Sequence, residues 1–270
     1  MLKKIFQLLG DEGIDVAAPI PLSECIIKKQ YLLERAGFSG TDGTVIMMAV
    51  PYFTPECVGA HVSAYAVSRD YHLFYKELFA RILPLLRAEF PKNKFCCFAD
   101  HSPIDERDAA LRAGLGVMGK NGLLITEKYS SFVFIGELIC DAELPCESHE
   151  PSGCFSCGLC LNACPMTDTR SCLSAVTQKK GELTEDEADY IRENGCAWGC
   201  DICQNVCPYT EQAIKSGSIF TPIPFFKERS IPHPTVRTVE QMSDEEFAER
   251  AFSWRGRECI LRNLRLLGKN

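Results

Sequence analysis

The sequence predicts a mixed α/β domain followed by a small cysteine-rich domain. In the first part of the chain, short apolar segments alternate with segments of helical periodicity, as in layered α/β folds. Of the sixteen cysteines, nine lie between Cys154 and Cys207, where the composition shifts to cysteine, glycine and polar residues. We therefore expect domains over residues 1–146 and 147–215, followed by an extended strap and short helices over 216–270.

The first hundred residues contain the clearest periodic signals. Residues 1–40 read as helices around loops, interrupted by Pro19 and Pro21. The near-continuous apolar run over 44–53 predicts a strand that is covered on both faces. Residues 64–90 have helical periodicity, and Pro84 is expected to kink or split that helix. The apolar stripe of this helix is predicted to comprise Phe74, Leu78, Ile82 and Leu85.

The remaining elements are shorter. A second apolar strand is expected over 95–100, a helix over 105–113, and strands over 123–126 and 132–139, with a glycine-rich turn at 113–122. In the cysteine-rich half, a charged helix is expected over 182–193. A Pro-rich strap follows Tyr209, and two helices, over 243–252 and 257–267, end the chain.

Charge and hydropathy exclude several classes of protein. The net charge of −7 argues against broad, unspecific binding of nucleic acid. No segment approaches the roughly 20 apolar residues of a membrane span. The N-terminus lacks the features of a secretory signal, so we expect a cytoplasmic protein without a membrane partner. Thiols in a reducing compartment favour metal or redox sites over disulfides.

The cysteine spacing indicates iron–sulfur clusters. Cys154-x2-Cys157-x2-Cys160-x3-Cys164-Pro165 is the run of bacterial ferredoxins, in which the fourth cysteine serves the other cluster. A second group, Cys200-x2-Cys203-x3-Cys207-Pro208, is one cysteine short of that run. Either Cys172 or Cys196 must complete it, and the spacing ranks Cys196 second.

Crossed ligation then predicts two [4Fe–4S] clusters. The first is ligated by Cys154, Cys157, Cys160 and Cys207, and the second by Cys164, Cys200, Cys203 and Cys172. The alternative is a pair of zinc sites, but zinc knuckles use pairs of cysteines rather than triplets closed by Cys-Pro.

Three polar motifs in the first domain suggest a binding pocket. The segment Tyr65-Ala-Val-Ser-Arg-Asp-Tyr-His72 precedes the long helix, Asp100-His-Ser-Pro leads to Arg107, and Ala113-Gly-Leu-Gly-Val-Met-Gly-Lys-Asn121 is rich in glycine. For each there is a structural alternative. His72 could be a hydrogen-bonded helix residue, and Asp100 could cap the helix that follows it.

Taken together, these motifs resemble the epoxyqueuosine reductase family. Its members share the Tyr-Ala-x-Gly-Arg-Asp-Tyr-His, Asp-(Ser/Thr)-(Gly/Ala)-Pro…Arg and Ala-Gly-(Ile/Leu)-Gly…Gly-Lys-Asn segments. The ferredoxin run follows, then segments that read here Arg170-Ser-Cys172-Leu-Ser and Gly199-Cys-Asp-Ile-Cys-Gln-Asn-Val-Cys-Pro208. The resemblance runs in order over residues ~60–210, and it favours Cys172 over Cys196 as the eighth ligand.

The resemblance implies an oxidoreductase of queuosine biosynthesis and tRNA processing. Its first domain would bind cobalamin in a fold similar to that of reductive dehalogenases. It would reduce epoxyqueuosine in tRNA to queuosine with electrons from a donor such as flavodoxin or ferredoxin. Asp100 would be the general acid, which requires burial to keep it protonated. The pocket residues implied by the family are His72, Arg107, Gly114, Gly116, Gly119, Lys120 and Asn121.

This sequence departs from the family pattern in places. Ser68 and His101-Ser102 replace the usual residues, and the helical-repeat domain that helps full-length members hold tRNA is absent, so we expect a short form. The basic tail (Arg255, Arg257, Arg262, Arg265 and Lys269) is expected to be a solvated helix end. Two alternative functions remain: a corrinoid iron–sulfur reductase of a free nucleoside or other small molecule, and a non-catalytic ferredoxin-type electron carrier.

Overall fold

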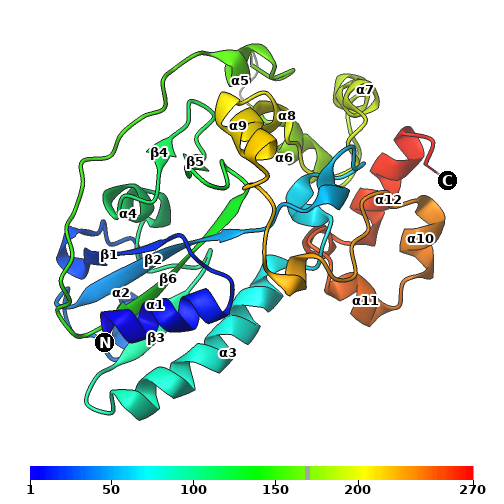
Figure 1. The fold of residues 1–270 in the computed structure, drawn as a ribbon. Coiled ribbons are helices and arrows are strands. Elements are labelled where there is room, and N and C mark those ends of the chain that lie inside the picture. Colours follow the sequence, from blue (N-terminus) through cyan, green and yellow to red (C-terminus); the bar gives the residue numbers. More distant parts are fainter. Residues whose placement is uncertain (168–170, 270) are drawn as a thin grey trace. The chain divides into compact units, whose positions relative to one another are not determined.

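The computed structural model describes residues 1–167 and 171–269 (Figure 1). The chain forms two compact units. The first comprises Met1–Pro51 and Phe74–Ser156, and the second comprises Tyr52–Leu73 and Cys157–Asn270. This division falls later than the expected boundary at 147, and it assigns Tyr52–Leu73 to the cysteine-rich unit. The functional ranges 1–146, 147–215 and 216–270 stay a prediction.

The first unit is built on a four-stranded antiparallel sheet (Figure 1). Its strand order is β1 (Ala17–Pro21), β2 (Thr44–Pro51), β6 (Val133–Cys140) and β3 (Phe95–Phe98). Every residue of β2 is buried, because β2 is a central strand with both faces covered. The strands expected near 44–53, 95–100 and 132–139 are therefore confirmed.

Strand β1 corrects the prediction for residues 1–40. Pro19 and Pro21 were expected to interrupt structure, yet both lie in β1, which pairs antiparallel with β2. Proline lacks the N–H that a central strand needs, but an edge strand has only one paired side. Because β1 is an edge of the sheet, it tolerates both prolines.

The helices of this unit flank the sheet. Helix α4 (Glu106–Arg112) corresponds to the helix expected over 105–113. The other elements are α1 (Leu2–Asp11), η1 (Leu22–Glu24), α2 (Gln30–Arg35), most of α3 (Tyr71–Glu89), and the short hairpin β4 (Val117–Met118) and β5 (Leu124–Ile125).

Helix α3 differs from its prediction in two respects. It begins at Tyr71 rather than near residue 64, and it runs unbroken through Pro84. Its buried stripe includes Phe74, Leu78 and Ile82, as predicted, but continues to Leu86, whereas Leu85 is 51% exposed. The four-residue step from Ile82 to Leu86 keeps the stripe on one face.

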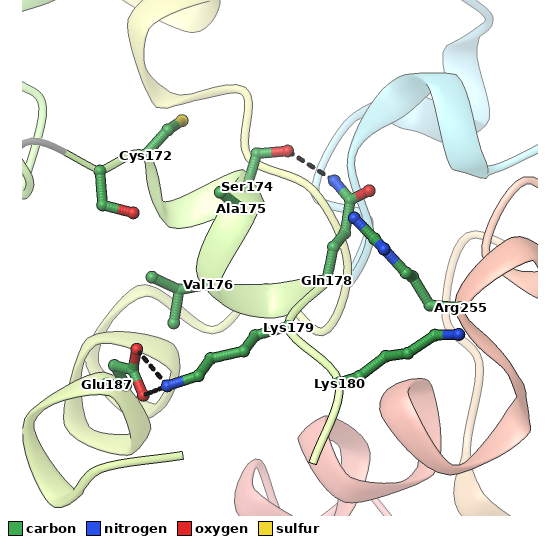
Figure 2. A pocket seen from close by; sticks show the side chains of 10 residues that line it. Cys172, Ser174, Ala175, Val176, Gln178, Lys179, Lys180, Glu187 and Arg255 are labelled. Carbon is green, nitrogen blue, oxygen red and sulfur yellow. Dashed lines mark hydrogen bonds and ion pairs between the residues drawn. The ribbon is translucent and has the colours of Figure 1, made fainter. Parts of the chain in front are cut away.

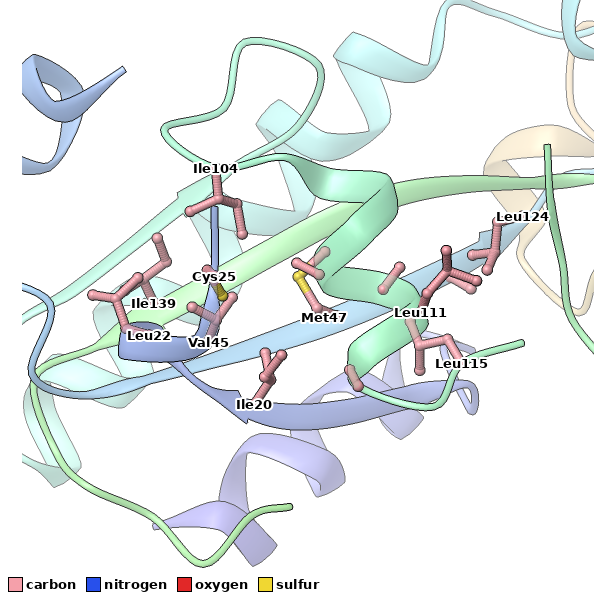
Figure 3. Packing of buried hydrophobic residues seen from close by; sticks show 14 of the residues in the cluster. Ile20, Leu22, Cys25, Val45, Met47, Ile104, Leu111, Leu115, Leu124 and Ile139 are labelled. Atoms are coloured by element: carbon pink, nitrogen blue, oxygen red, sulfur yellow. The ribbon is translucent and has the colours of Figure 1, made fainter. Parts of the chain in front are cut away.

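The main core of the first unit lies between the sheet and α4 (Figure 3). Val45 and Met47 of β2 and Ile139 of β6 pack there with Leu111 of α4 and Leu124 of β5. Side chains alternate along a strand, so on β6 the odd-numbered residues share the face of Ile139. Gly136 lies on the opposite face, where Tyr75 of α3 occupies the space that a side chain would need.

The second unit is mainly helical. Helix α7 (Glu185–Asn194) confirms the expected charged helix and begins at a capping box between Thr184 and Glu187. The other helices are α5 (Leu159–Asn162), α6 (Leu173–Thr177), α8 (Ile202–Asn205), α9 (Pro208–Ser216), α10 (Val236–Gln241), α11 (Asp244–Ala248) and α12 (Arg257–Leu266). Short 3₁₀ turns are η2 (Pro55–Cys57), η3 (Ala64–Ala66), η4 (Pro224–Phe226) and η5 (Ser253–Arg255).

A buried aromatic centre organises the second unit. Trp198 and Phe252 are both 0% exposed and meet edge to face, with ring centroids 6.3 Å apart. Ile260 and Leu264 of α12 join the same core. Within residues 1–167 and 171–269, no helix combines the length and the apolar character that crossing a bilayer requires.

Candidate functional site

The predicted cluster cysteines lie on or beside short helices. Cys160 is in α5, Cys203 is in α8, and Cys172 and Cys207 occupy the N-cap positions of α6 and α9. Helices α5 and α8 contact each other. Of the eight predicted ligands, Cys154 alone is assigned to the first unit, close to where the units divide. Arg170, which precedes Cys172 in the quoted motif, lies outside the described residues.

The cysteines predicted for the second cluster share one neighbourhood. Burial raises the pKa of Cys200 to about 12, and the nearby thiols of Cys172 and Cys203 add to the shift. Cys164 and Cys200 pack against the same apolar cluster, which comprises Met166, Leu173, Val176 and Ile191. Cys200 thus lies near Cys172 and Cys203 and shares an apolar cluster with Cys164, and four thiols have the donor chemistry that a [4Fe–4S] cluster requires.

Cys196 has a different environment. Its Sγ donates to the carbonyl oxygen of Trp198 at 3.3 Å, and burial raises its pKa to about 12. Its burial and its hydrogen bond explain why a cysteine is accommodated at this position without any role as a cluster ligand. This supports the prediction that Cys172, not Cys196, is the eighth ligand.

No three His, Cys, Asp or Glu side chains converge tightly enough to hold a single metal ion in the described part of the chain. A [4Fe–4S] cluster is ligated by four thiolates, each on a different iron, so its ligands stand further apart than those of one ion. The number of clusters therefore remains a prediction from the cysteine pattern.

Asp201 is a supporting residue that sequence reasoning missed. It lies between Cys200 and Cys203, and its carboxylate accepts hydrogen bonds from the Ser63 hydroxyl at 2.5 Å and the Ala64 N–H at 2.6 Å. Gln204 donates to the same carboxylate at 2.8 Å. Burial raises the pKa of Asp201, and these donors oppose that shift. Through these hydrogen bonds, Asp201 of the Cys-Asp-x-Cys-Gln motif connects η3 and the residue before it to the segment that carries Cys200 and Cys203.

Asn263 and Thr177 anchor the other side of this loop. The buried Asn263 amide donates to the carbonyl oxygens of Thr177 and Ala197 at 2.7 and 2.8 Å. The Thr177 hydroxyl accepts the Gly199 N–H at 2.9 Å. Gly199 has φ +76, and a Cβ there would collide with Ser63. Glycine is therefore required just before Cys200.

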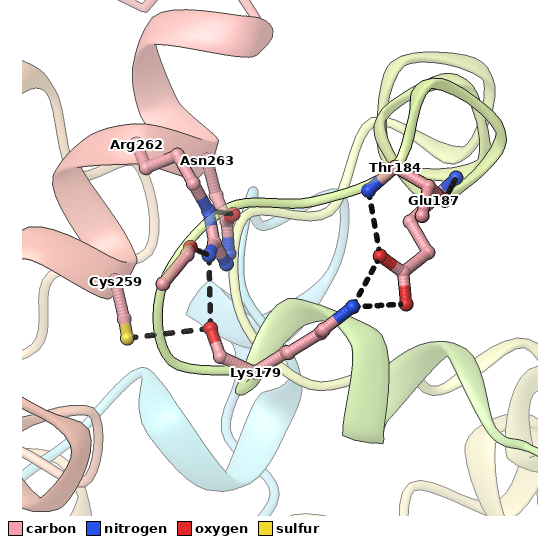
Figure 4. A network of polar contacts seen from close by, with 7 residues as sticks. Lys179, Thr184, Glu187, Cys259, Arg262 and Asn263 are labelled. Carbon is pink, nitrogen blue, oxygen red and sulfur yellow. Dashed lines mark hydrogen bonds and ion pairs between the residues drawn. The ribbon is translucent and has the colours of Figure 1, made fainter.

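Three arginines of the basic tail contact other residues of the same unit, and Figure 4 shows the contacts of Arg262. Arg262 donates to the carbonyl oxygens of Lys179, at 2.9 Å, and of Gly181. Arg257 pairs with Asp244, and Arg265 pairs with Glu240, both at 3.0 Å. The expectation of a solvated helix end is therefore not met for Arg262, whose guanidinium group contacts two backbone carbonyl oxygens.

A cavity of about 710 Å³ opens beside Cys172 (Figure 2). Its lining includes Lys179, Lys180 and Arg255, and Lys179 is paired with Glu187 at 2.7 Å. Cys172 is itself exposed. A predicted cluster ligand thus reaches the surface next to cationic side chains.

In the first unit, the Asp100 loop leaves the end of β3. Asp100 has φ +63, and its N–H donates to Glu106 Oε1 at 3.0 Å. The N-cap of α4 is Asp105, whose carboxylate accepts the Asp108 N–H, so the interpretation of Asp100 as the cap is wrong. The Asp100 side chain is exposed, so the expected burial is also absent.

Arg107 and the glycine-rich turn adjoin this loop. Arg107 is the next residue along α4 after Glu106, and its Nη1 donates to the Gly122 carbonyl oxygen at 3.2 Å. Lys120 is exposed, whereas the Asn121 side chain accepts the Leu123 N–H at 3.3 Å. The structure therefore brings Arg107 close to the glycine-rich turn, as predicted for one pocket.

The glycines themselves have structural explanations. A Cβ on Gly116 would collide with the Ile125 carbonyl oxygen, and one on Gly119 would collide with the Asn121 side chain. Gly114 has φ +76. The missing side chains thus allow β4 and β5 to pair closely, and any role against a cofactor stays a proposal.

We expect Gly116→Ala to destabilise the protein by ~1–3 kcal/mol, because the new methyl group meets backbone that cannot move aside cheaply. Thermal unfolding of the full chain measures the effect. Gly10→Ala in α1 is the control: its Cβ meets nothing within 4 Å, so it should leave stability unchanged or raise it slightly. Equal melting temperatures for the two variants would contradict the steric account.

His72 belongs to the second unit. Its Nδ1 lies 2.6 Å from Asp70 Oδ1, which also accepts the His72 N–H at 2.8 Å. His72 is therefore a hydrogen-bonded residue in the first turn of α3, and its pocket role stays a proposal. Nearby, the buried Ser68 donates to the Phe225 carbonyl oxygen at 3.1 Å, which explains how the serine is accommodated there.

A buried carboxyl group in the first unit, that of Glu137, was not predicted. Glu137 of β6 is 0% exposed and lies on the face that packs against α4. Among the described residues, neither of its carboxyl oxygens has a hydrogen-bond partner of good geometry. Burial raises the pKa of Glu137 well above 4.5, and the nearby Glu106 carboxyl adds to the shift. Sequence analysis missed Glu137 because the other seven residues of β6 are apolar or small, so the segment was interpreted only as a buried strand.

Glu137 should make stability fall as pH rises. The pKa of Glu137 is higher in the folded protein than in the unfolded chain. Its contribution to the free energy of unfolding is therefore complete at pH values below the unfolded-state pKa, and it is lost as the pH rises from the unfolded-state pKa to the folded-state pKa. Relative to Glu137→Gln, the wild type should lose up to ~1.4 kcal/mol per pH unit across this window. Denaturant unfolding at pH 5 to 8 measures the difference. Parallel stability curves for the two proteins would show that Glu137 does not titrate in this way.

Comparison with known proteins identifies epoxyqueuosine reductases among the relatives of this chain. No family model matches the chain. An epoxyqueuosine reductase of Gloeobacter violaceus is 32% identical over 218 residues, covering 76% of this chain and 68% of the relative. One from Escherichia coli is 30% identical over 212 residues, covering 67% and 56%, so the chain spans little more than half of that relative.

Solved structures give the same result for the fold. A crystal structure of selenomethionine-labelled epoxyqueuosine reductase superimposes with a TM-score of 0.77 over 98% of this chain and 80% of that one, at 22% identity. A structure of the enzyme with an epoxyqueuosine-modified tRNA-Tyr stem loop gives a TM-score of 0.75 with the same coverage and identity. With a relative 32% identical over two thirds of its length, the chain belongs to the epoxyqueuosine reductase family.

Proposed function

We propose that this protein reduces epoxyqueuosine in tRNA to queuosine. The observation that carries the proposal is the family relationship to proteins named epoxyqueuosine reductase, combined with a full set of family cysteines. The reaction takes up two electrons and two protons, releases the epoxide oxygen as water and leaves a carbon–carbon double bond. Because the substrate is tRNA, we place the reaction in the cytoplasm.

The electrons would pass through two [4Fe–4S] clusters. Cys154, Cys157, Cys160 and Cys207 would hold one cluster, and Cys164, Cys172, Cys200 and Cys203 would hold the other. The shared surroundings of Cys164, Cys172, Cys200 and Cys203 support the second set. A donor such as flavodoxin or ferredoxin would dock beside Cys172, where Lys180 and Arg255 would attract an acidic partner.

The first unit would supply the proton and part of the pocket. Asp100, exposed in this structure, would protonate the oxygen that leaves the epoxide carbon once bound cofactor and substrate cover its carboxyl, with Arg107 and Lys120 at the pocket edge. Cobalamin, when bound, would supply a low-valent cobalt centre able to cleave the carbon–oxygen bond. The exposed Arg107 and Lys120 fit contacts with polar groups at its periphery, and Gly114, Gly116, Gly119 and Asn121 would form the adjoining turn.

Nucleoside analysis of tRNA from a strain lacking this gene tests the proposal. We expect epoxyqueuosine to accumulate and queuosine to disappear, and the wild-type gene to restore queuosine. Normal queuosine in the deletion strain would instead favour a small-molecule substrate. An optical spectrum of the protein reconstituted with iron, sulfide and cobalamin then separates the remaining alternative, since an electron carrier without corrinoid would show no stoichiometric corrin bands.

A further inference from the structure

The cavity beside Cys172 carries an excess of positive charge (Figure 2). Lys179 is neutralised there, because its Nζ lies 2.7 Å from a carboxylate oxygen of Glu187. Lys180 and Arg255 also line the cavity, and neither forms an ion pair within the described part of the chain. The whole chain has a net charge of −7, so this surface is opposite in sign to the protein that carries it.

The wall of this cavity is held by contacts within the second unit. The Arg255 guanidinium carbon lies 3.6 Å from the ring centroid of Trp254, which is itself exposed. The Gln178 amide, also part of the lining, donates to the Ser174 hydroxyl at 2.9 Å and to the Tyr65 hydroxyl at 3.3 Å. The polar groups of the wall are therefore in place before a partner arrives, which lowers the entropic cost of binding.

Cys172 brings the second predicted cluster to this surface. It is exposed, whereas the other three ligands predicted for that cluster, Cys164, Cys200 and Cys203, are partly buried. Electron transfer between proteins slows steeply with distance, so a donor must approach a cluster from the side of its most accessible ligand. A small contact is sufficient, because redox encounters typically bury less than about 1,200 Å².

Cys157, a ligand predicted for the first cluster, is also exposed, but its surroundings differ. No charged residue occurs between positions 151 and 166 of the sequence. Leu159 and Leu161 of α5, which follow Cys157, are exposed apolar side chains. An acidic partner would therefore be attracted to the cavity beside Cys172 and not to the segment around Cys157.

We propose that an acidic one-electron donor protein docks on the Cys172 surface, defined by Cys172, Lys180 and Arg255, and that electrons enter through the cluster of Cys172 before they reach the other one. This inference deepens the proposed function, because it rests on the two clusters of that proposal and gives them an order. At each encounter the donor is oxidised by one electron and the cluster is reduced by one. Two encounters therefore supply the two electrons of the reaction.

Stopped-flow reduction of the cluster-loaded full chain by reduced flavodoxin, an acidic flavoprotein, tests the docking surface. At low ionic strength, Lys180→Glu should lower the second-order rate constant about tenfold, and Lys180→Glu with Arg255→Gln about a hundredfold, within the range of electrostatic steering. Both differences should shrink in about 0.5 M salt, because salt screens exposed charges. Lys180 is exposed, so its single variant carries the test if the double variant fails to fold.

Two controls separate docking from other effects. Arg237→Glu reverses an exposed cation of α10 that does not line the cavity, so this variant should be reduced near the wild-type rate. Photoreduced deazaflavin is a small neutral reductant that needs no docking surface, and it should reduce all variants alike. Equal flavodoxin rates for Lys180→Glu and Arg237→Glu, or a loss that persists at high salt, would overturn the docking surface.

The remaining outcomes test the kind of partner and the order of the clusters. Weaker binding of a tRNA stem loop by Lys180→Glu, with unchanged reduction by flavodoxin, would assign the surface to RNA and overturn the inference. In Cys172→Ala, deazaflavin should reduce the remaining cluster, but flavodoxin should do so far more slowly than in the wild type; a wild-type rate would refute entry through Cys172. A protein that accepts electrons from flavodoxin as expected but converts no epoxyqueuosine would refute the proposed function and leave the docking surface intact.

Discussion

Replacing Cys172 by alanine is expected to remove or convert one of the two clusters, whereas replacing Cys196 should leave the iron content unchanged. Two [4Fe–4S] clusters correspond to about 8 iron atoms per chain. Cys172 lies near the thiol of Cys200 and is exposed at the N-cap of α6. Without its thiolate the second cluster has only three protein ligands, so the transfer of electrons to the substrate should fail.

Cys196→Ala is the matched control, because it removes a thiol four residues before Cys200. In the structure, Cys196 instead donates a hydrogen bond from its Sγ to the Trp198 carbonyl oxygen. Its loss should cost ~1 kcal/mol of stability at most and no iron. Iron and sulfide analysis with electron paramagnetic resonance of the reduced protein measures both variants. Full iron in Cys172→Ala and a deficit in Cys196→Ala would mean that Cys196 is the eighth ligand.

The sequence predicted the elements whose signals are local. The apolar run of β2, the charged helix α7 and the spaced cysteines each depend on neighbours within a few positions. Strand β1 was missed because Pro19 and Pro21 read as breaks unless one knows that the strand lies at an edge of the sheet. Being an edge strand is a property of the whole sheet.

The supporting residues were missed for a similar reason. Asp201 contacts Ser63 and Ala64, more than a hundred positions earlier, and Glu137 lies in the sheet opposite Met47 and Phe98. Asp201 could have been noticed, since an acidic residue inside a cysteine motif is unusual among apolar and small neighbours. The environment of Asp100 could not have been noticed in the same way, because the neighbouring His101 contacts Lys29 and Tyr31, which lie about seventy positions earlier in the sequence.

Asp100→Asn is expected to reduce the rate of epoxide reduction by ~10²–10⁴-fold, the usual cost of removing a positioned general acid. Asparagine has nearly the same size as aspartate and also tolerates a positive φ, so the N–H bond to Glu106 should survive. What is lost is the acidic proton. The measurement is single-turnover conversion of epoxyqueuosine-containing tRNA by fully loaded protein, with tRNA binding and iron content determined alongside.

Asp105→Asn is the control for this substitution. Asp105 caps α4 and lies five residues from Asp100, and asparagine caps helices about as well as aspartate, so this variant should turn over near the wild-type rate. A large loss in Asp100→Asn, with binding and clusters retained, assigns the defect to the chemical step. If Asp100→Asn instead reacts within a factor of a few of wild type, Asp100 is not the acid, and the proton must come from another group or from water.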